Sequence, residues 1–278
     1  MVDGGGGSGI GWPGDATTVI GAHLASDDPL ERARAVGADA IQLFIGNPQT
    51  WRKPAPRSDA EALVSSRLPI YVHAPYLINL ASPNNRIRIP SRQTLANAAE
   101  AAAAISAKAL VVHGGHVGED ESPEAGFVRW RKALSEREFP LPILIENTAG
   151  GENAVARRLD VIARLWQEIG EFGVGFCLDT CHFWSAGEDL AGVVAGVRQA
   201  TGRLDLVHCN DSRDPFGSNR DRHANLGEGE IPFELLLGIL RAAATPVLVE
   251  TPEEGQAQDI ARLRAGLAKS EKLGTPTS

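Results

Sequence analysis

The sequence predicts an α/β fold of the (β/α)8 TIM-barrel class, and three observations lead to this prediction. Eight short aliphatic or β-branched runs recur along the 278 residues, helical patterns lie between them, and no glycine-rich dinucleotide loop follows the first run. Strands that alternate with helices indicate a parallel sheet, and eight such units in about 250 residues are typical of a closed barrel. An open doubly wound sheet is the alternative, because alternation alone does not establish that the sheet closes.

The eight predicted strands are near-continuous hydrophobic runs, as expected for strands that are buried on both faces. They span residues 18–22, 40–44, 70–74, 109–113, 143–147, 174–179, 204–209 and 246–251. Helical patterns are clearest at 91–109, where Ser91 is a candidate N-cap, and at 154–170. Weaker helical patterns lie at 29–37, 188–200, 232–244 and about 256–270.

Composition indicates one globular domain. With 43% hydrophobic and 22% charged residues a sizeable core is expected, and we place a single barrel domain at 17–268, between a flexible glycine-rich leader at 1–16 and a frayed tail at 269–278. Only three cysteines, no secretory signal and no apolar run long enough to cross a bilayer favour a cytoplasmic protein. The net charge of −8 argues against a protein that binds nucleic acid over its whole surface.

Residues that can bind metal stand at the ends of six consecutive predicted strands. From the third strand to the eighth they are His73, His113, Glu146, Asp179 with His182, His208 with Asp221 and His223 in the following loop, and Glu250. In a barrel, functional side chains gather at the C-terminal ends of the strands. A lone histidine there is more often structural, but six such ends would leave a cluster of buried polar groups without a cation. The set therefore predicts a metal cluster at the C-terminal face of the barrel.

The ligand types also limit the chemistry. Imidazole combined with carboxylate suits zinc, manganese or iron. Nine ligands are too many for one tetrahedral ion, whereas bridging carboxylates could hold two or three ions, each with an open position. Such a cluster suits the cleavage of phosphate esters, because it can deprotonate a water, hold the phosphate oxygens and stabilise the leaving oxygen.

Five motifs resemble those of the endonuclease IV family, the zinc-dependent apurinic/apyrimidinic (AP) endonuclease family 2 of base-excision repair. They are YVHAPYLINLASP (71–83), LIENTAGG (144–151), CLDTCH (177–182), HCNDSRDPFGSNRDRHANLGEGEI (208–231) and VETP (249–252). The similarity spans essentially the whole chain from Ile20 to Pro252, and the motif around DRHANLGEGEI is highly specific.

The resemblance implies a barrel with three zinc ions, for which manganese is a possible substitute. The first ion would take His73, His113 and Glu146. The second would share Glu146 as a bridge and add Asp179, His208 and Glu250, and the third would take His182, Asp221 and His223. The nucleophile that the resemblance implies is a metal-bridging hydroxide, oriented by Glu146.

The substrate implied by the resemblance is duplex DNA with an abasic site, which is flipped out and cleaved on its 5′ side to give a 3′-hydroxyl and a 5′-deoxyribose phosphate. Family members also trim blocked 3′ ends, and the resemblance indicates a monomer. Candidate DNA contacts are Gln49, Tyr76, Arg220 and Arg222, and Gln49 stands where many members carry an arginine that enters the DNA stack. Three divalent ions would add about +6 at the mouth of the barrel, which answers the objection from net charge.

The stretch CLDTCH contains four residues that can bind metal, and we expect only two of them to do so. Cys177 should point into the packed barrel, where a buried cysteine behaves as a small hydrophobe, and Cys181 should pack against the wall. Asp179 and His182 stand where the strand is predicted to turn into a loop, so they can serve different ions.

Two other functions remain open. A metal-dependent sugar isomerase or epimerase shares this barrel class, but it needs about two ions and has no use for the DRH triplet at 221–223. A non-catalytic protein that binds DNA damage would keep the same ligands, and only Gln49 and the altered loop after the first strand favour it.

Overall fold

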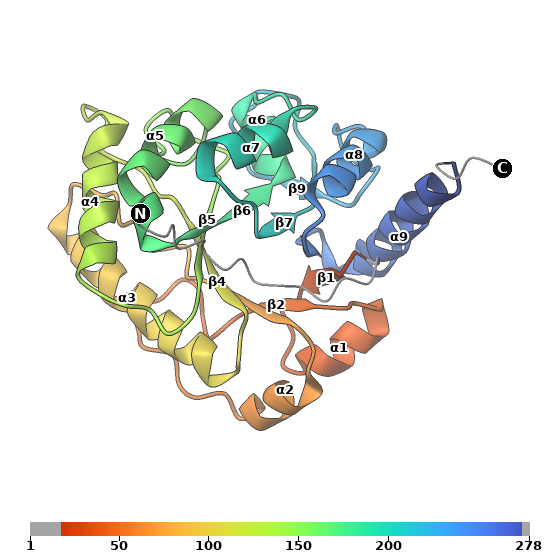
Figure 1. The fold of residues 1–278 in the computed structure, drawn as a ribbon. Coiled ribbons are helices and arrows are strands. Elements are labelled where there is room, and N and C mark those ends of the chain that lie inside the picture. Colours follow the sequence, from red (N-terminus) through yellow and green to blue (C-terminus); the bar gives the residue numbers. More distant parts are fainter. Residues whose placement is uncertain (1–17, 274–278) are drawn as a thin grey trace, which may run out of the picture.

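The computed structural model describes residues 18–273 and shows eight parallel strands closed into a barrel, with helices around it (Figure 1). The strands lie in the order β1-β10-β7-β6-β5-β4-β3-β2. Their bounds are β1 Ile20–His23, β2 Ile41–Phe44, β3 Ile70–His73, β4 Ala109–His113, β5 Ile143–Glu146, β6 Gly175–Asp179, β7 Leu206–His208 and β10 Val247–Val249. All eight predicted strands are present, and the closed barrel is confirmed over the open sheet.

Alternate residues of the strands form two hydrophobic layers. One set fills the interior of the barrel and consists of Ala40, Tyr71, Ala109, Val111, Leu144, Cys177, Leu206 and Leu248. The residues between them, such as Leu110 and Val112, belong to the larger core under the helices. Two-sided burial explains why the strands read as continuous hydrophobic runs in the sequence. Cys177 is fully buried in the interior, as predicted.

More helices cover the barrel than were predicted, and some of them begin at other residues. They are α1 Pro29–Val36, α2 Ala60–Ser66, α3 Asn85–Ala104, α4 Pro123–Ser135, α5 Leu159–Ile169, α6 Thr180–Ala186, α7 Val193–Thr201, α8 Phe233–Ala243 and α9 Gln256–Leu273, with 3-10 turns at Gly170–Phe172 and Glu253–Gly255. Among these, α2, α4 and α6 were not predicted. For α4 the sequence does carry a signal, because Phe127, Trp130 and Leu134 have helical spacing and are buried.

The prediction of Ser91 as an N-cap is wrong. The helix α3 begins at Asn85, and the side chain of Asn84 caps it by accepting a hydrogen bond of 2.9 Å from the backbone N–H of Arg86. Ser91 lies within the helix and is fully buried. Its hydroxyl donates to the carbonyl of Ile87 and accepts from the backbone N–H of Asn79, so it ties α3 to the loop after β3.

Two further corrections concern the segments after β5 and β6. The helix α5 begins at Leu159 rather than near 154, because the preceding residues pair with the loop after β4: the backbone N–H of Val155 donates to Gly115 at 3.0 Å. After β6 the predicted loop is instead the helix α6, and the carboxylate of Asp179 caps it by accepting a 2.7 Å hydrogen bond from the backbone N–H of His182.

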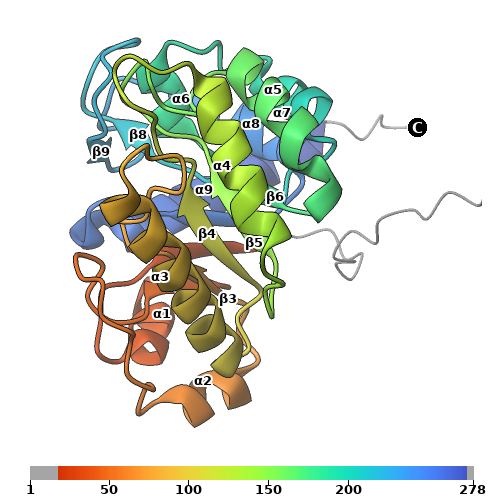
Figure 2. The ribbon, with the colours of Figure 1, turned by 90° about the vertical axis from the view of Figure 1, so that its left-hand side faces the viewer.

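A small antiparallel pair, β8 Asp211–Ser212 and β9 His223–Ala224, lies outside the barrel (Figure 2). The buried carboxylate of Asp211 accepts hydrogen bonds of 2.9 to 3.0 Å from three backbone N–H groups, those of Gly227, Gly229 and Ile231. These bonds fix the segment that follows β9 and so hold the DRH triplet at the mouth of the barrel.

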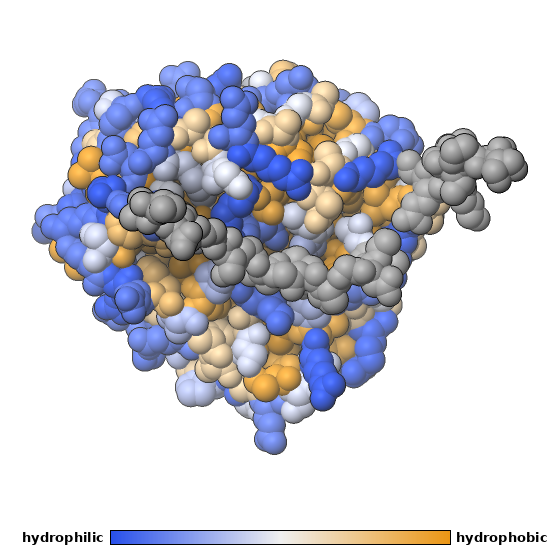
Figure 3. Space-filling view, viewed as in Figure 1, coloured by the Kyte–Doolittle hydropathy of each residue, from blue (hydrophilic) through white to orange (hydrophobic). Residues whose placement is uncertain are grey.

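The predicted leader at 1–16 lies outside the described residues, and the domain boundaries stay a prediction. The helix α9 continues past 268 to Leu273, and residues 274–278 again lie outside. None of the helices between residues 18 and 273 is long and apolar enough to cross a membrane. The face in Figure 3 shows hydrophilic residues along much of the rim and smaller hydrophobic areas between them, as on an ordinary protein surface.

Candidate metal centre

The structure brings all nine predicted metal ligands together at the C-terminal ends of the strands. They fall into overlapping groups in which the potential ligand atoms lie within 4.8 Å of one another: His73, His113 and Glu146; Glu146, Asp179, His208 and Glu250; Asp179, His182 and His223; and Asp221 and His223 with Cys181. The parallel arrangement is the reason, since every strand of the barrel ends on the same face.

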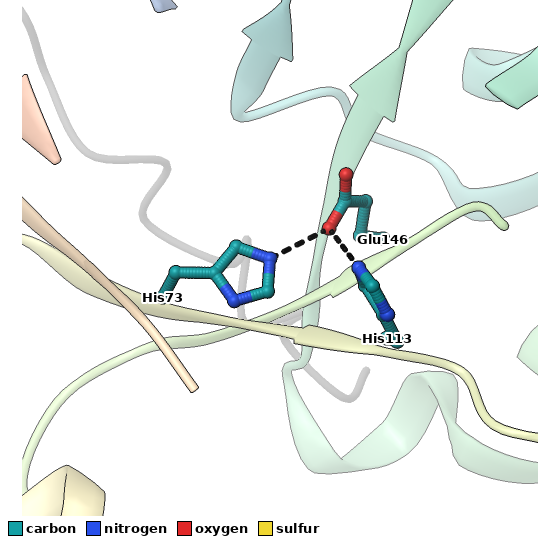
Figure 4. Close-up of side chains that lie close together, drawn as sticks. All are labelled: His73, His113 and Glu146. Atoms are coloured by element: carbon teal, nitrogen blue, oxygen red, sulfur yellow. Dashed lines mark hydrogen bonds and ion pairs between the residues drawn. The ribbon is translucent and has the colours of Figure 1, made fainter. Parts of the chain in front are cut away.

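The first group centres on one oxygen of Glu146 (Figure 4). The Nε2 atoms of His73 and His113 each lie 3.2 Å from Oε2 of Glu146, approaching it from neighbouring strands. Glu146 is fully buried at the end of β5. Two imidazole nitrogens and a carboxylate oxygen that converge in this way can fill three of the four positions around a tetrahedral zinc ion.

The second group uses the other oxygen of the same carboxylate. The Nδ1 atom of His208 lies 3.0 Å from Oε1 of Glu146 and 3.2 Å from Oε2 of Glu250. Asp179 completes the group from the end of β6. Glu146 therefore faces two groups with its two oxygens, which is the arrangement that a bridging carboxylate requires.

The last two sets share His223, and we treat His182, Asp221 and His223 together as the third group, which lies nearest the solvent. The Nε2 atoms of His182 and His223 each lie 3.1 Å from an oxygen of Asp221, whose side chain is half exposed. Both Nε2 atoms are buried, and their contact with Asp221 does not have the geometry of a hydrogen bond. Two imidazole nitrogens that face one carboxylate in this way fit a bound cation.

Cys181 also lies at the third group, which differs from the expectation that it only packs against the wall. Its sulfur is within 4.8 Å of the potential ligand atoms of Asp221 and His223, and the residue is fully buried. Burial, assisted by the charge of Asp179, raises the pKa of the Cys181 thiol to about 12. Since the thiolate is the form that binds metal, an ion would have to displace this proton in order to bind the sulfur.

Hydrogen bonds to the outer atoms of the imidazoles orient three of these rings. The Nδ1 atom of His73 lies 2.8 Å from the carbonyl oxygen of Ala74, that of His182 lies 2.8 Å from the carbonyl of Asn147, and that of His223 lies 3.2 Å from the carbonyl of Glu250. A carbonyl can only accept, so Nδ1 carries a proton, and in the neutral ring Nε2 then presents its lone pair to the site.

Two asparagines support the carboxylates, and the sequence analysis missed both. The amide of Asn147 exchanges hydrogen bonds of 2.8 and 3.0 Å with the backbone of Asp179. The amide nitrogen of Asn210 donates to Oδ2 of Asp179 at 2.6 Å, and its oxygen accepts from the backbone N–H of Glu250 at 2.7 Å. Their position directly beside predicted ligands was the available signal.

The buried acidic and imidazole groups of the site shift one another's pKa values. Burial by itself lowers the pKa values of His182 and His208, but neighbouring acidic groups outweigh it and raise both well above the ordinary value. Burial likewise raises the pKa of Glu146, but the surrounding imidazoles outweigh it and lower that pKa well below the usual range. Glu146 is therefore ionised and attracts positive charge, whereas burial raises the pKa of Asp179.

Six of the nine ligands line a cavity of about 260 Å³ at the mouth of the barrel: His73, His113, His182, Asp221, His223 and Glu250. Phe44 and Tyr76 form part of its wall, with the Tyr76 ring 5.5 Å from that of His73 and 54% of the residue exposed. The remaining predicted DNA contacts lie on loops: Gln49 is exposed after β2, and Arg220 and Arg222 are exposed but both pair with the carboxylate of Asp214.

Fold and site define the class of this protein: a (β/α)8 barrel that carries a histidine and carboxylate centre at its mouth. Residues 30–270 match the family model of the xylose isomerase-like TIM barrels. The curated protein "Probable endonuclease 4" of Mycobacterium tuberculosis is 58% identical over 88% of this chain and 98% of its own length, and that of Mycobacterium marinum is 58% identical over 90% and 99%. The chain belongs to the endonuclease IV family and is a nuclease.

Solved structures agree with this assignment. The crystal structure of endonuclease IV from Thermus thermophilus has a TM-score of 0.77 and 33% identity, covering 90% of this chain and 99% of that one. A D-tagatose 3-epimerase-like protein has a TM-score of 0.77 but only 19% identity, over 92% of this chain and 100% of that one. The second likeness shows a shared fold alone.

Proposed function

We propose that the protein is a DNA-repair endonuclease that hydrolyses the phosphodiester bond 5′ to an abasic site in duplex DNA, giving a 3′-hydroxyl and a 5′-deoxyribose phosphate. One observation carries the proposal: three groups of imidazole and carboxylate ligands converge on one cavity, and two of them share Glu146. Membership of the endonuclease IV family supports it. The same site would trim blocked 3′ ends, and we expect the protein to act as a monomer.

The proposed cofactor is zinc, three ions per chain, with manganese as a possible substitute. The residues that would hold the ions are the nine ligands His73, His113, Glu146, Asp179, His182, His208, Asp221, His223 and Glu250. The buried Nε2 atoms of His182 and His223, which each lie 3.1 Å from the carboxylate of Asp221, support this fit. Bound zinc would lower the pKa of a water and neutralise phosphate oxygens.

The residues of the chain would act by holding and orienting the reactants. Glu146 is buried with one oxygen toward each of two groups, so it is placed to orient the attacking water between them. The exposed ring of Tyr76 on the wall can contact the DNA beside the flipped nucleotide. Gln49, exposed on the loop after β2, can hydrogen-bond within the opened stack.

The experiment that tests the proposal is incision of a duplex that contains one synthetic abasic site, with and without a chelator. We expect metal-dependent cleavage on the 5′ side and about three zinc ions per chain by elemental analysis. No incision by fully zinc-loaded protein would refute the proposal. A stoichiometry of two ions, with turnover of a ketose, would instead favour the isomerase or epimerase alternative.

A further inference from the structure

Two strands of the barrel provide no predicted metal ligand, yet each carries a buried polar side chain at the metal centre. On β1 this is His23, and on β2 it is Gln42, which is fully buried. The amide nitrogen Nε2 of Gln42 lies 2.6 Å from Oε1 of Glu250, and its oxygen Oε1 lies 3.0 Å from Nε2 of His208. Gln42 thus contacts two proposed ligands that come from β7 and from the end of β10.

The chemistry of these groups determines the direction of both hydrogen bonds. An ionised carboxylate can only accept, so the NH2 group of Gln42 must be the part that faces Glu250. The carbonyl oxygen of the amide then faces His208, and because it too can only accept, Nε2 of His208 must carry a proton. In the neutral ring this leaves Nδ1 of His208 with its lone pair directed at Glu146 and Glu250.

His208 differs in this respect from the three imidazoles whose outer atoms bond to backbone carbonyls. His73, His182 and His223 all turn Nδ1 away from the site and present Nε2. His208 presents Nδ1, and its outer nitrogen is bonded to a side chain, Gln42. A backbone carbonyl remains when a side chain is mutated, whereas the orientation of His208 depends on one residue that can be replaced.

We propose that Gln42 is a positioning residue of the metal centre: its amide sets the tautomer of His208 and at the same time holds Glu250, so that both present their ligand atoms to one ion. The inference rests on the proposed function in that this ion is a metal. Outer partners of this kind hold ligands in place and raise their basicity, and their loss typically weakens metal binding by about 10- to 100-fold.

The test compares three variants by zinc affinity, measured in competition with a chelator, and by nitrogen NMR of the imidazoles in the zinc-loaded protein. Gln42→Leu removes both hydrogen bonds, and we expect zinc binding to weaken about 10- to 100-fold and the Nε2–H signal of His208 to shift or to exchange rapidly. Gln42→Glu keeps an oxygen toward His208 but replaces the donor to Glu250, so the His208 signal should return to its wild-type form.

His23→Phe is the matched control. His23 contacts Glu250 through Nδ1 at 3.0 Å, and the same atom lies 3.0 Å from the amide nitrogen of Gln42, but His23 has no hydrogen bond to His208 or to the amide oxygen of Gln42 among the described residues. This variant should therefore leave the His208 signal unchanged. Comparison of His23→Phe with Gln42→Leu therefore separates the loss of a contact with Glu250 from a change in the tautomer of His208.

Several results would overturn the inference. Wild-type zinc affinity in folded Gln42→Leu would do so, and so would a loss of affinity with an unaltered His208 signal, which would indicate packing alone. If Gln42→Leu does not fold, the Gln42→Glu protein decides, since loss of its Nε2–H signal contradicts the proposal. Failure of the wild-type protein to bind zinc would instead refute the proposed metal centre itself.

Discussion

The Nε2 atom of His182 lies 3.1 Å from Oδ2 of Asp221, which joins the start of α6 to the loop before β9. The histidine is buried, with 3% of its side chain exposed, whereas half of the aspartate side chain is open to solvent. The third group therefore depends on a contact between a rigid helix and a surface loop. Ligand loss should be easiest to observe at this group.

Substitutions in the CLDTCH stretch should distinguish the residues that bind zinc from those that only lie beside the zinc site. We expect Asp179→Ala and His182→Ala to lose bound zinc and cleavage together, because each removes a buried ligand from a shared cluster. Cys181→Ser should keep most activity, since the neutral thiol is a poor ligand. Elemental analysis and incision rates measure both effects. Loss of one zinc ion in Cys181→Ser would show that the sulfur is a ligand after all.

Glu146→Gln should keep the fold and lose cleavage. The amide has nearly the shape of the carboxylate, but it cannot bridge two cations or orient a water as an ionised group does, so we expect a loss of about 100-fold or more in the incision rate. Circular dichroism and zinc content provide the controls. Cleavage near the wild-type rate with intact metal content would exclude the proposed role.

Gln49→Arg should strengthen binding to DNA. An added positive charge on the exposed loop after β2 can contact a phosphate, so the slope of log affinity against log salt concentration should steepen by about 1. Gln49→Met is the control, since it keeps about the length of the glutamine side chain without adding a charge. Fluorescence anisotropy with an abasic duplex at several salt concentrations measures the slope. An unchanged slope would place residue 49 away from the DNA backbone.

Acid should weaken the ion pair between Arg129 and Glu121, which stabilises the loop after β4. The guanidinium of Arg129 binds Glu121 and also donates to the carbonyl of Ala81 at 2.7 Å, so it links the loops after β3 and β4. The hydrogen bond from Arg129 lowers the pKa of Glu121 from 4.5 to about 2. Because this pKa is lowered on folding, the stabilisation is complete above pH 4.5 and is lost as pH falls toward 2.

The expected consequence concerns Glu121→Gln, which should have a lower melting temperature than the wild type at pH 7. The difference should narrow steadily below pH 4.5, where the Glu121 carboxyl group of the unfolded chain begins to gain a proton while that of the folded protein stays ionised. Thermal unfolding between pH 3 and 7 measures it. A difference that stays constant over this range would mean that the charge of Glu121 is not what matters.

The helix boundaries could not be read from the sequence, because they depend on contacts between distant loops. Ser91 has the character of an N-cap, but Asn84 begins α3, and Ser91 is instead used to bind Asn79. The segment at 154 has a helical pattern, yet its backbone pairs with Gly115. Local propensity is a weak guide wherever the backbone has such a competing partner.

The sequence by itself determined the barrel and the residues at its mouth. Strands buried on both faces must be hydrophobic throughout, and polar residues at six strand ends can meet only on one face. Closure of the barrel alone decided which of these residues share an oxygen of Glu146 and which outer partners support them. Gln42 is an unremarkable polar residue within a hydrophobic run, and it gains a role only because closure of the barrel through β1 brings β2 near β10 and β7. Hydrogen bonds act over about 3 Å, so partners this far apart in the chain are selected by the tertiary fold.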